Sequence, residues 1–125
     1  MIIPLLEKAI ASRAPLMDSK HESAFRLFNG FTEGFPDLIV DIYAATAVIH
    51  DYADNLEQGA LIVQEAQQLL ATSLPWLRAG IVKTRNGATA EDKRGKLLFG
   101  TELDRKIKEH GVWYAINLTL NRDSS

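Results

Sequence analysis

Residues 24–53, AFRLFNGFTEGFPDLIVDIYAATAVIHDYA, constrain the fold more than any other part of the chain. Three β-prone runs lie within this stretch, at Ala24–Phe28, Leu38–Tyr43 and Val48–Tyr52, and residues that favour turns separate them. Leu38–Tyr43 shows little alternation of polar and apolar residues, which is typical of a strand covered on both faces. We therefore expect these strands to form the scaffold on which the rest of the chain packs.

The turns within this stretch have their own residue chemistry. Asn29-Gly30 is a dipeptide that tolerates positive φ, so we expect the chain to reverse there. Gly34 and Pro36 mark the end of the irregular loop that follows. These four residues are thus predicted to have structural roles.

Size and composition limit the classes of function. A chain of 125 residues, 46% of them hydrophobic, can bury one core, so we expect one compact domain. A net charge of −2 is not the global signature of a nucleic-acid-binding domain, so any RNA contact must be a local patch. No cysteine is present, which excludes disulfides, thiolate metal sites and a cysteine nucleophile and favours a cytoplasmic protein. No apolar run approaches the ~20 residues that cross a bilayer, so we expect no membrane contact.

Two helices are predicted outside the scaffold. Pro4 can occupy the first turn of a short helix that Pro15 stops, and the segment 1–23 reads as this helix and a linker. His21 in that linker is expected to be a solvated loop residue. The main helix begins at Asp54, which we predict to be its N-cap in a capping box with Glu57.

Later segments complete the expected sheet. The pattern predicts strands at Ala79–Arg85 and Lys96–Phe99, a polar loop between them, and a hairpin that turns at His110-Gly111. The hairpin arms are Leu103–Glu109 and Val112–Leu120, and one face of the second arm is expected in the core. The predicted fold is α+β, a mixed and mostly antiparallel sheet with one long packed helix and a short N-terminal helix.

Cations on one strand and the loop after it form the candidate RNA-binding set. Lys83 and Arg85 share a face at a spacing of about 7 Å, close to that of successive phosphates of a nucleic-acid strand. The alternative is that these charges form an ordinary solvated surface. The candidate set is Lys83, Arg85, Lys93, Arg94 and Lys96.

Asp41 is a polar residue in the most apolar run of the chain. We predict a structural ion pair between Asp41 and Arg26 on the neighbouring strand. A small enzyme acting through Asp41, His50 or His110 is a further alternative, which would require two of these side chains within hydrogen-bond reach in one cleft. His50 and Asp51 are adjacent on a strand, point to opposite faces and make a poor dyad. No metal-ligand spacing and no phosphate-binding loop occurs in the sequence.

The residues FRLFNG at 25–30 and EGFPDLIVDIY at 33–43 resemble a known family. The likeness is to the segment between the N-terminal PUA domain and the catalytic domain of class I SAM-dependent methyltransferases of the ribosomal RNA large-subunit type. IVKTR at 81–85 and EHGVWYAINL at 109–118 resemble later strands of that segment. Phe31 and Asp37 depart from the usual acidic residue and glycine, which suggests a divergent subgroup.

The resemblance implies a binding part of a larger enzyme. The family's SAM-binding loop and the cysteine of its cytosine-C5 methylating members are absent here, so no catalytic or cofactor-binding residue is predicted in this chain. S-adenosylmethionine would belong to the full-length protein, with a C-terminal methyltransferase domain and RNA as partners. Residues 24–120 would be the substrate-recognition domain, and 121–125 would begin a linker to the catalytic domain.

A docking or dimerisation domain without nucleic-acid contact remains the main alternative. It predicts a large exposed apolar patch near Leu118 and Leu120, whereas RNA recognition predicts a continuous basic strip.

Overall fold

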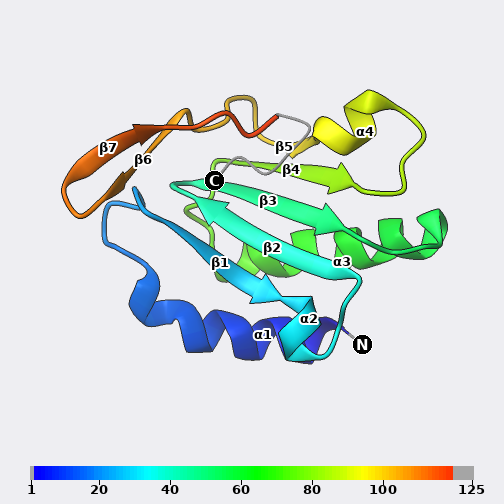
Figure 1. Ribbon diagram of the computed structural model, residues 1–125. Coiled ribbons are helices and arrows are strands. Elements are labelled where there is room, and N and C mark those ends of the chain that lie inside the picture. The colour runs from blue at the N-terminus through cyan, green and yellow to red at the C-terminus, as the bar shows by residue number, and fades with distance from the viewer. Residues whose placement is uncertain (1, 120–125) are drawn as a thin grey trace.

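One mixed sheet of five strands forms the centre of the molecule in the computed structural model, which describes residues 2–119 (Figure 1). The spatial order of the strands follows their order in the chain. β3 and β4 run parallel, and the other neighbouring pairs are antiparallel. The strands are β1 (Ala24–Asn29), β2 (Leu38–Tyr43), β3 (Thr46–Asp51), β4 (Ala79–Thr84) and β5 (Lys96–Phe99). The predicted α+β architecture is confirmed.

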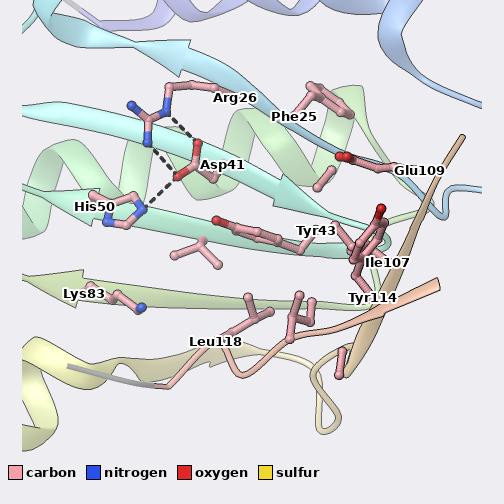
Figure 2. Close-up of a pocket in the computed structure, with 14 residues that line it drawn as sticks. Phe25, Arg26, Asp41, Tyr43, His50, Lys83, Ile107, Glu109, Tyr114 and Leu118 are labelled. Carbon is pink, nitrogen blue, oxygen red and sulfur yellow. Dashed lines mark hydrogen bonds and ion pairs between the residues drawn. The ribbon is translucent and has the colours of Figure 1, made fainter. Parts of the chain in front are cut away.

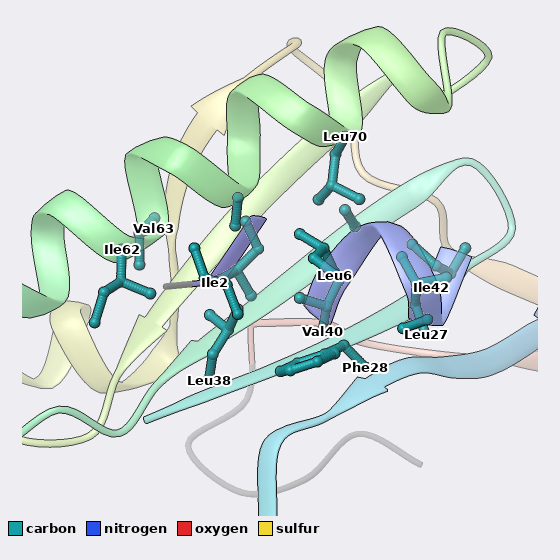
Figure 3. Packing of buried hydrophobic residues seen from close by; sticks show 14 of the residues in the cluster. Ile2, Leu6, Leu27, Phe28, Leu38, Val40, Ile42, Ile62, Val63 and Leu70 are labelled. Atoms are coloured by element: carbon teal, nitrogen blue, oxygen red, sulfur yellow. The ribbon is translucent and has the colours of Figure 1, made fainter. Parts of the chain in front are cut away.

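Two helices cover one face of this sheet and enclose the main core. α1 (Ile2–Arg13) and α3 (Leu56–Ser73) pack against each other and against the strands (Figure 3). α1 buries Ile2, Leu6 and Ala9, so the N-terminal helix lies across the sheet and belongs to the same core. The other buried members of this cluster are Leu27, Phe28, Leu38, Val40, Ile42, Ala47, Ile49, Ile62, Val63, Ala66, Leu70 and Leu74.

The connection between β1 and β2 differs from the predicted reversal at Asn29-Gly30. Asn29 instead caps a one-turn helix, α2 (Gly30–Glu33), and the left-handed residue is Gly34, with φ +91°. Gly30 is required for a different reason, because a Cβ there would lie 2.0 Å from the carbonyl oxygen of Phe35. Close approach of two backbones, and not positive φ, selects this glycine.

The cap of the main helix is also one residue later than predicted. Asn55 is the N-cap, and its side chain accepts the backbone N–H of Gln58 at 2.8 Å. Asp54 lies outside the helix. Amide and carboxylate oxygens both cap well, so the neighbouring residues Asp54 and Asn55 could not be separated by residue type alone.

The expected loop between β4 and β5 contains a short helix, α4 (Ala90–Arg94). Thr89 and Asp92 form a capping box at its start, which supplies partners for the backbone N–H groups of its first turn. α4 lies beside β4, so its cations stay near that strand.

A separate hairpin of β6 (Lys106–Glu109) and β7 (Val112–Ala115) follows β5. It turns at His110-Gly111 as predicted, with positive φ at both residues. The expectation that one face of the second arm is core is wrong for β7, because all four of its residues are exposed. No third strand extends this two-stranded sheet within residues 2–119, so β7 faces solvent. Leu118 beyond it is buried, and Leu120 lies outside the described residues.

His21 is not the solvated loop residue that was expected. Its ring stacks on Trp76 with 3.8 Å between ring centroids, and its Nδ1 is buried without a hydrogen-bond partner among the described residues. Trp76 itself packs at the edge of the main core, so the linker is anchored there through His21.

Candidate binding site

The face of the sheet opposite α1 and α3 carries the polar side chains of the candidate site. The strand register places Arg26 opposite Asp41, and Asp41 opposite Val48. His50 lies opposite Lys83 in the parallel pair. Residues opposite each other in a ladder share a face, so the register brings these groups from four strands onto one surface.

A cavity of about 500 Å³ lies between this face and the C-terminal hairpin (Figure 2). Figure 2 shows Arg26, Asp41 and His50 gathered at one end and Ile107 and Tyr114 at the other. The wall is mainly apolar, with a few polar groups, which is the usual composition of a small-molecule site. Its remaining lining residues are Ala24, Phe25, Tyr43, Val48, Lys83, Glu109, Ala115, Ile116 and Leu118.

Asp41 and Arg26 form the ion pair that the sequence suggested. Nε and Nη2 of Arg26 donate to the two carboxylate oxygens of Asp41 at 2.8 and 3.1 Å. The carboxylate is buried and the Arg26 side chain is 47% exposed, so the arginine spans the distance from the sheet to solvent. A two-point contact of this kind fixes the guanidinium plane.

His50 is a second partner of the same carboxylate. Its Nε2 lies 3.1 Å from Oδ2 of Asp41. Burial alone would raise the pKa of Asp41, but hydrogen bonds from His50 and Arg26 outweigh it, so its pKa is lowered. Asp41 is therefore ionised at neutral pH.

This contact meets the geometric condition set for an enzyme acting through Asp41 and His50, since both line one cavity. A nucleophilic dyad would also need a hydroxyl or thiol group within reach of the imidazole. The hydroxyl groups among the described lining residues are those of Tyr43 and Tyr114, and none belongs to a serine or threonine. Both oxygens of Asp41 are already held by basic partners, an arrangement suited to positioning Arg26 and His50.

A row of aromatic rings continues from His50 toward the end of β4. The ring of Tyr52 lies 6.2 Å from that of His50 and 5.7 Å from that of Phe31. The guanidinium carbon of Arg85 is 5.4 Å from the Tyr52 centroid. Phe31 is 62% exposed, an unusual position for so large an apolar ring. We call Phe31, Tyr52 and Arg85 the aromatic row.

The five predicted cations occupy three places. Lys83 lines the cavity, and Arg85 belongs to the aromatic row. Lys93 and Arg94 lie on α4, and both are exposed. The amine of Lys96 binds Asp92 at 2.8 Å, so part of its charge is already matched.

Sequence reasoning missed the contact between His50 and Asp41. Asp41 pairs with Val48 and Ile39 with His50, so His50 is the diagonal neighbour of Asp41 on one face. A two-residue turn at Ala44-Ala45 would have given this register. From the sequence, Asp41 and His50 were only two of three candidates for a catalytic pair, and the neighbour considered for His50 was Asp51, which lies on the other face.

Asp104 holds the C-terminal segment against the end of the sheet. Its carboxylate accepts the backbone N–H of Ala45 at 3.0 Å and the hydroxyl of Thr46 at 2.6 Å, and it also binds Arg78. The backbone N–H of Asp104 in turn donates to the Thr46 hydroxyl. These contacts fix the base of the segment that closes the cavity.

Two functional classes can be checked on the part of the chain that the structure describes. Within residues 2–119, no cluster of three or more His, Cys, Asp or Glu side chains is arranged to hold a metal ion. No helix in the same range has the length and apolar character needed to traverse a bilayer.

Comparison with known proteins gives a fold likeness. No protein-family model and no curated protein matches the chain. A solved Streptococcus mutans structure, described provisionally as a SAM-dependent methyltransferase, superposes with a TM-score of 0.77 at 22% sequence identity. The structure of SMU.776, which is described provisionally as a methyltransferase and was solved in complex with SAH, also has a TM-score of 0.77 and 22% sequence identity.

The likeness covers nearly all of this chain and a minor part of each neighbour. The match includes 98% of the present chain but 31% and 30% of the two neighbouring chains. The chain therefore spans about a third of the length of the solved proteins that it resembles.

Proposed function

We propose that this chain is the substrate-recognition part of a SAM-dependent methyltransferase that acts on RNA. The fold likeness supports the parent class, because nearly the whole chain superposes on part of a protein described as such an enzyme. The resemblance at residues 25–43 points independently to the same class. In this proposal SAM binds elsewhere in the parent protein, and the present residues hold the substrate.

The aromatic row carries the proposal of RNA as the substrate. Single-stranded RNA is bound by cations that follow the backbone and by aromatic rings on which bases stack. Exposed Phe31, half-buried Tyr52 and the Arg85 guanidinium supply both kinds of group within one row. Lys83 lies on the strand that leads to Arg85, so the cationic groups extend from the cavity to the row.

Charge reversal tests this proposal. K83E and R85E are each expected to weaken binding of a single-stranded RNA by at least about tenfold at low salt. Each should also reduce the salt slope by about 0.7 for every phosphate that the variant no longer neutralises. The readout is fluorescence anisotropy of a labelled oligonucleotide across a salt series.

A control variant separates this effect from net charge. Lys8 is exposed on α1, on the other face of the sheet, so K8E changes the net charge equally without touching the row. Equal decreases in affinity for K8E and R85E, or unchanged affinity in all three variants, would exclude the proposed surface.

A docking or dimerisation role is the second candidate, favoured by exposed apolar residues of β7. Val112, Trp113 and Tyr114 are 51%, 43% and 51% exposed, although Tyr114 also lines the cavity and the amines of Lys106 and Lys108 lie over the Trp113 ring. If this strand is a dimer interface, sedimentation will show a concentration-dependent dimer that V112K abolishes. A monomer over the whole concentration range would exclude homodimerisation.

A further inference from the structure

We infer that the cavity between the sheet and the C-terminal hairpin binds one unstacked nucleobase of the RNA substrate. This inference rests on the proposed RNA-binding function and adds a specific subsite to it. The observations that carry it are the volume of the cavity, the arrangement of its wall and its charge balance.

The cavity has a size and wall suited to a flat organic ligand. Its volume of about 500 Å³ lies within the range of ligand pockets. Tyr114, Ile107 and Phe25 supply apolar or aromatic surface on the hairpin side and beside β1. An unstacked base loses its contacts with the neighbouring bases, and contacts with aromatic and apolar side chains can replace them.

The opposite end of the cavity carries hydrogen-bonding groups. Arg26 uses Nε and Nη2 to bind Asp41, so its remaining amino group, Nη1, makes none of the described hydrogen bonds. His50 and Lys83 line the same end. The polar edge of a base can be read by these groups while its ring lies against the apolar wall.

The charge balance favours a base over a phosphate inside the cavity. The cations Arg26 and Lys83 are matched by the anions Asp41 and Glu109 among its lining residues. Asp41 remains ionised, because His50 and Arg26 hold its pKa low against the effect of burial. A site balanced in this way suits a neutral ligand, and the phosphates would lie outside, toward Arg85.

The cavity is also in reach of the aromatic row. His50 lines the cavity, and its ring faces that of Tyr52 at 6.2 Å. One nucleotide can therefore occupy the cavity while its neighbours stack along Tyr52 and Phe31. This continuity links a pocket for one base to a surface for a strand.

Two adjacent residues of β7 provide a matched test. Tyr114 lines the cavity, whereas Trp113 is not among its lining residues and lies between Lys106 and Lys108. Both rings are largely exposed, so we expect the fold to tolerate their removal. Y114A is expected to weaken nucleotide binding about tenfold, the scale of one base–aromatic stack, and W113A by less than about twofold. A115W, which adds bulk at the exposed rim, should block binding without removing a charge.

Two probes distinguish this inference from the broader proposal. The first is a free nucleoside 5′-monophosphate, followed by NMR shifts of the methyl groups of Ile107, Ile116 and Leu118. The second is a single-stranded RNA containing 2-aminopurine, whose fluorescence is quenched when the base enters the cavity. We expect shifts at these methyls and quenching in the wild type, and neither in A115W.

Each outcome bears on one of the two proposals. RNA binding that depends on salt and on Arg85 but is unaffected by A115W and Y114A would overturn the base pocket and leave the RNA surface intact. Nucleotide shifts at the three methyls without RNA binding would support the pocket and exclude RNA as the ligand. Equal decreases in affinity for the nucleoside monophosphate in Y114A and W113A would also overturn the assignment of the cavity as the base pocket.

Discussion

Arg26 and Asp41 face each other across the β1–β2 ladder and are joined by two hydrogen bonds of 2.8 and 3.1 Å. They are 15 positions apart in the chain, and the pairing of two antiparallel strands brings them together. The contact organises the polar end of the cavity, because the same carboxylate also holds His50. Its removal should therefore affect stability and site geometry together.

D41N is expected to lower the free energy of unfolding at pH 7 by about 1–3 kcal/mol. Removing one partner of a fully buried ion pair costs roughly 3–5 kcal/mol, and we expect a smaller loss here because Arg26 is half exposed. Because the pKa of Asp41 is lowered on folding, its contribution is present above the ordinary value of 3.8 and disappears as pH falls through the folded value. The difference from wild type should therefore shrink below about pH 4. Urea denaturation at several pH values measures it.

A surface aspartate provides the control for D41N. Asp92 also has a cationic partner, Lys96, and this pair is the more exposed of the two, with side chains 19% and 51% exposed against 9% and 47% for Asp41 and Arg26. D92N should have a smaller effect at pH 7. An equal decrease in stability for D41N and D92N would contradict the role assigned to the buried pair.

Asp51 should show the opposite pH dependence. Burial raises the pKa of Asp51, and the nearby negative charge of Asp37 raises it further. The hydrogen bond from the Ala53 N–H lowers the pKa but does not outweigh these two effects. A raised folded pKa means that the carboxylate destabilises the fold as pH rises through that value. D51N is expected to be more stable than wild type at pH 7, by less than about 1 kcal/mol, with the gain vanishing near pH 3. Thermal unfolding that shows D51N less stable at pH 7 would refute this sign.

The two glycines of the β1–β2 connection should differ in their tolerance of alanine. A Cβ at Gly30 would meet the carbonyl oxygens of Phe35 and Leu38 at 2.0 and 2.2 Å, and no flexible side chain is available to yield. G30A is expected to cost about 3 kcal/mol or more. Gly34 has open space but a φ of +91°, so G34A should cost only about 1 kcal/mol. Denaturation midpoints in the reverse order would contradict this explanation.

The position of the α3 cap gives a paired test. Asn55 accepts the Gln58 N–H, so N55A should destabilise the protein by about 1 kcal/mol. Asp54 is exposed outside the helix, and D54A should change stability by less than about 0.5 kcal/mol. Chemical denaturation of both variants checks the assignment, which fails if D54A is the more damaging.

The strands of the scaffold could be predicted because their signals are local. Apolar runs bounded by turn residues gave β1, β2 and β3 close to their observed limits, and His110-Gly111 gave the hairpin turn. Asn29-Gly30 gave the right place for a change of direction with the wrong backbone conformation. The reason for Gly30 is a contact with residues 35 and 38, which no local pattern reveals.

The site was predictable only in part, because it depends on which segments cover the sheet. The sequence suggested the Arg26–Asp41 pair and placed Lys83 on a strand. It did not reveal the cavity, which needs Leu118 to pack over Val48 and Ile81. The alternation in Val112–Leu120 predicted a buried face along the whole arm. Val112–Ala115 are instead exposed, Ile116 is partly buried, and Leu118 is the buried residue among those that the structure describes.

The parallel pairing of β3 with β4 has a consequence for the order of assembly. β1, β2 and β3 can meet through short connections, whereas β4 reaches its place only after α3 has crossed the sheet. Contacts between distant segments form late in folding, because a longer loop must close first. Lys83 and Leu118 both come after that crossover, so the cavity is expected to be completed last during refolding. Ligand capture would then serve as a reporter of the final folding step.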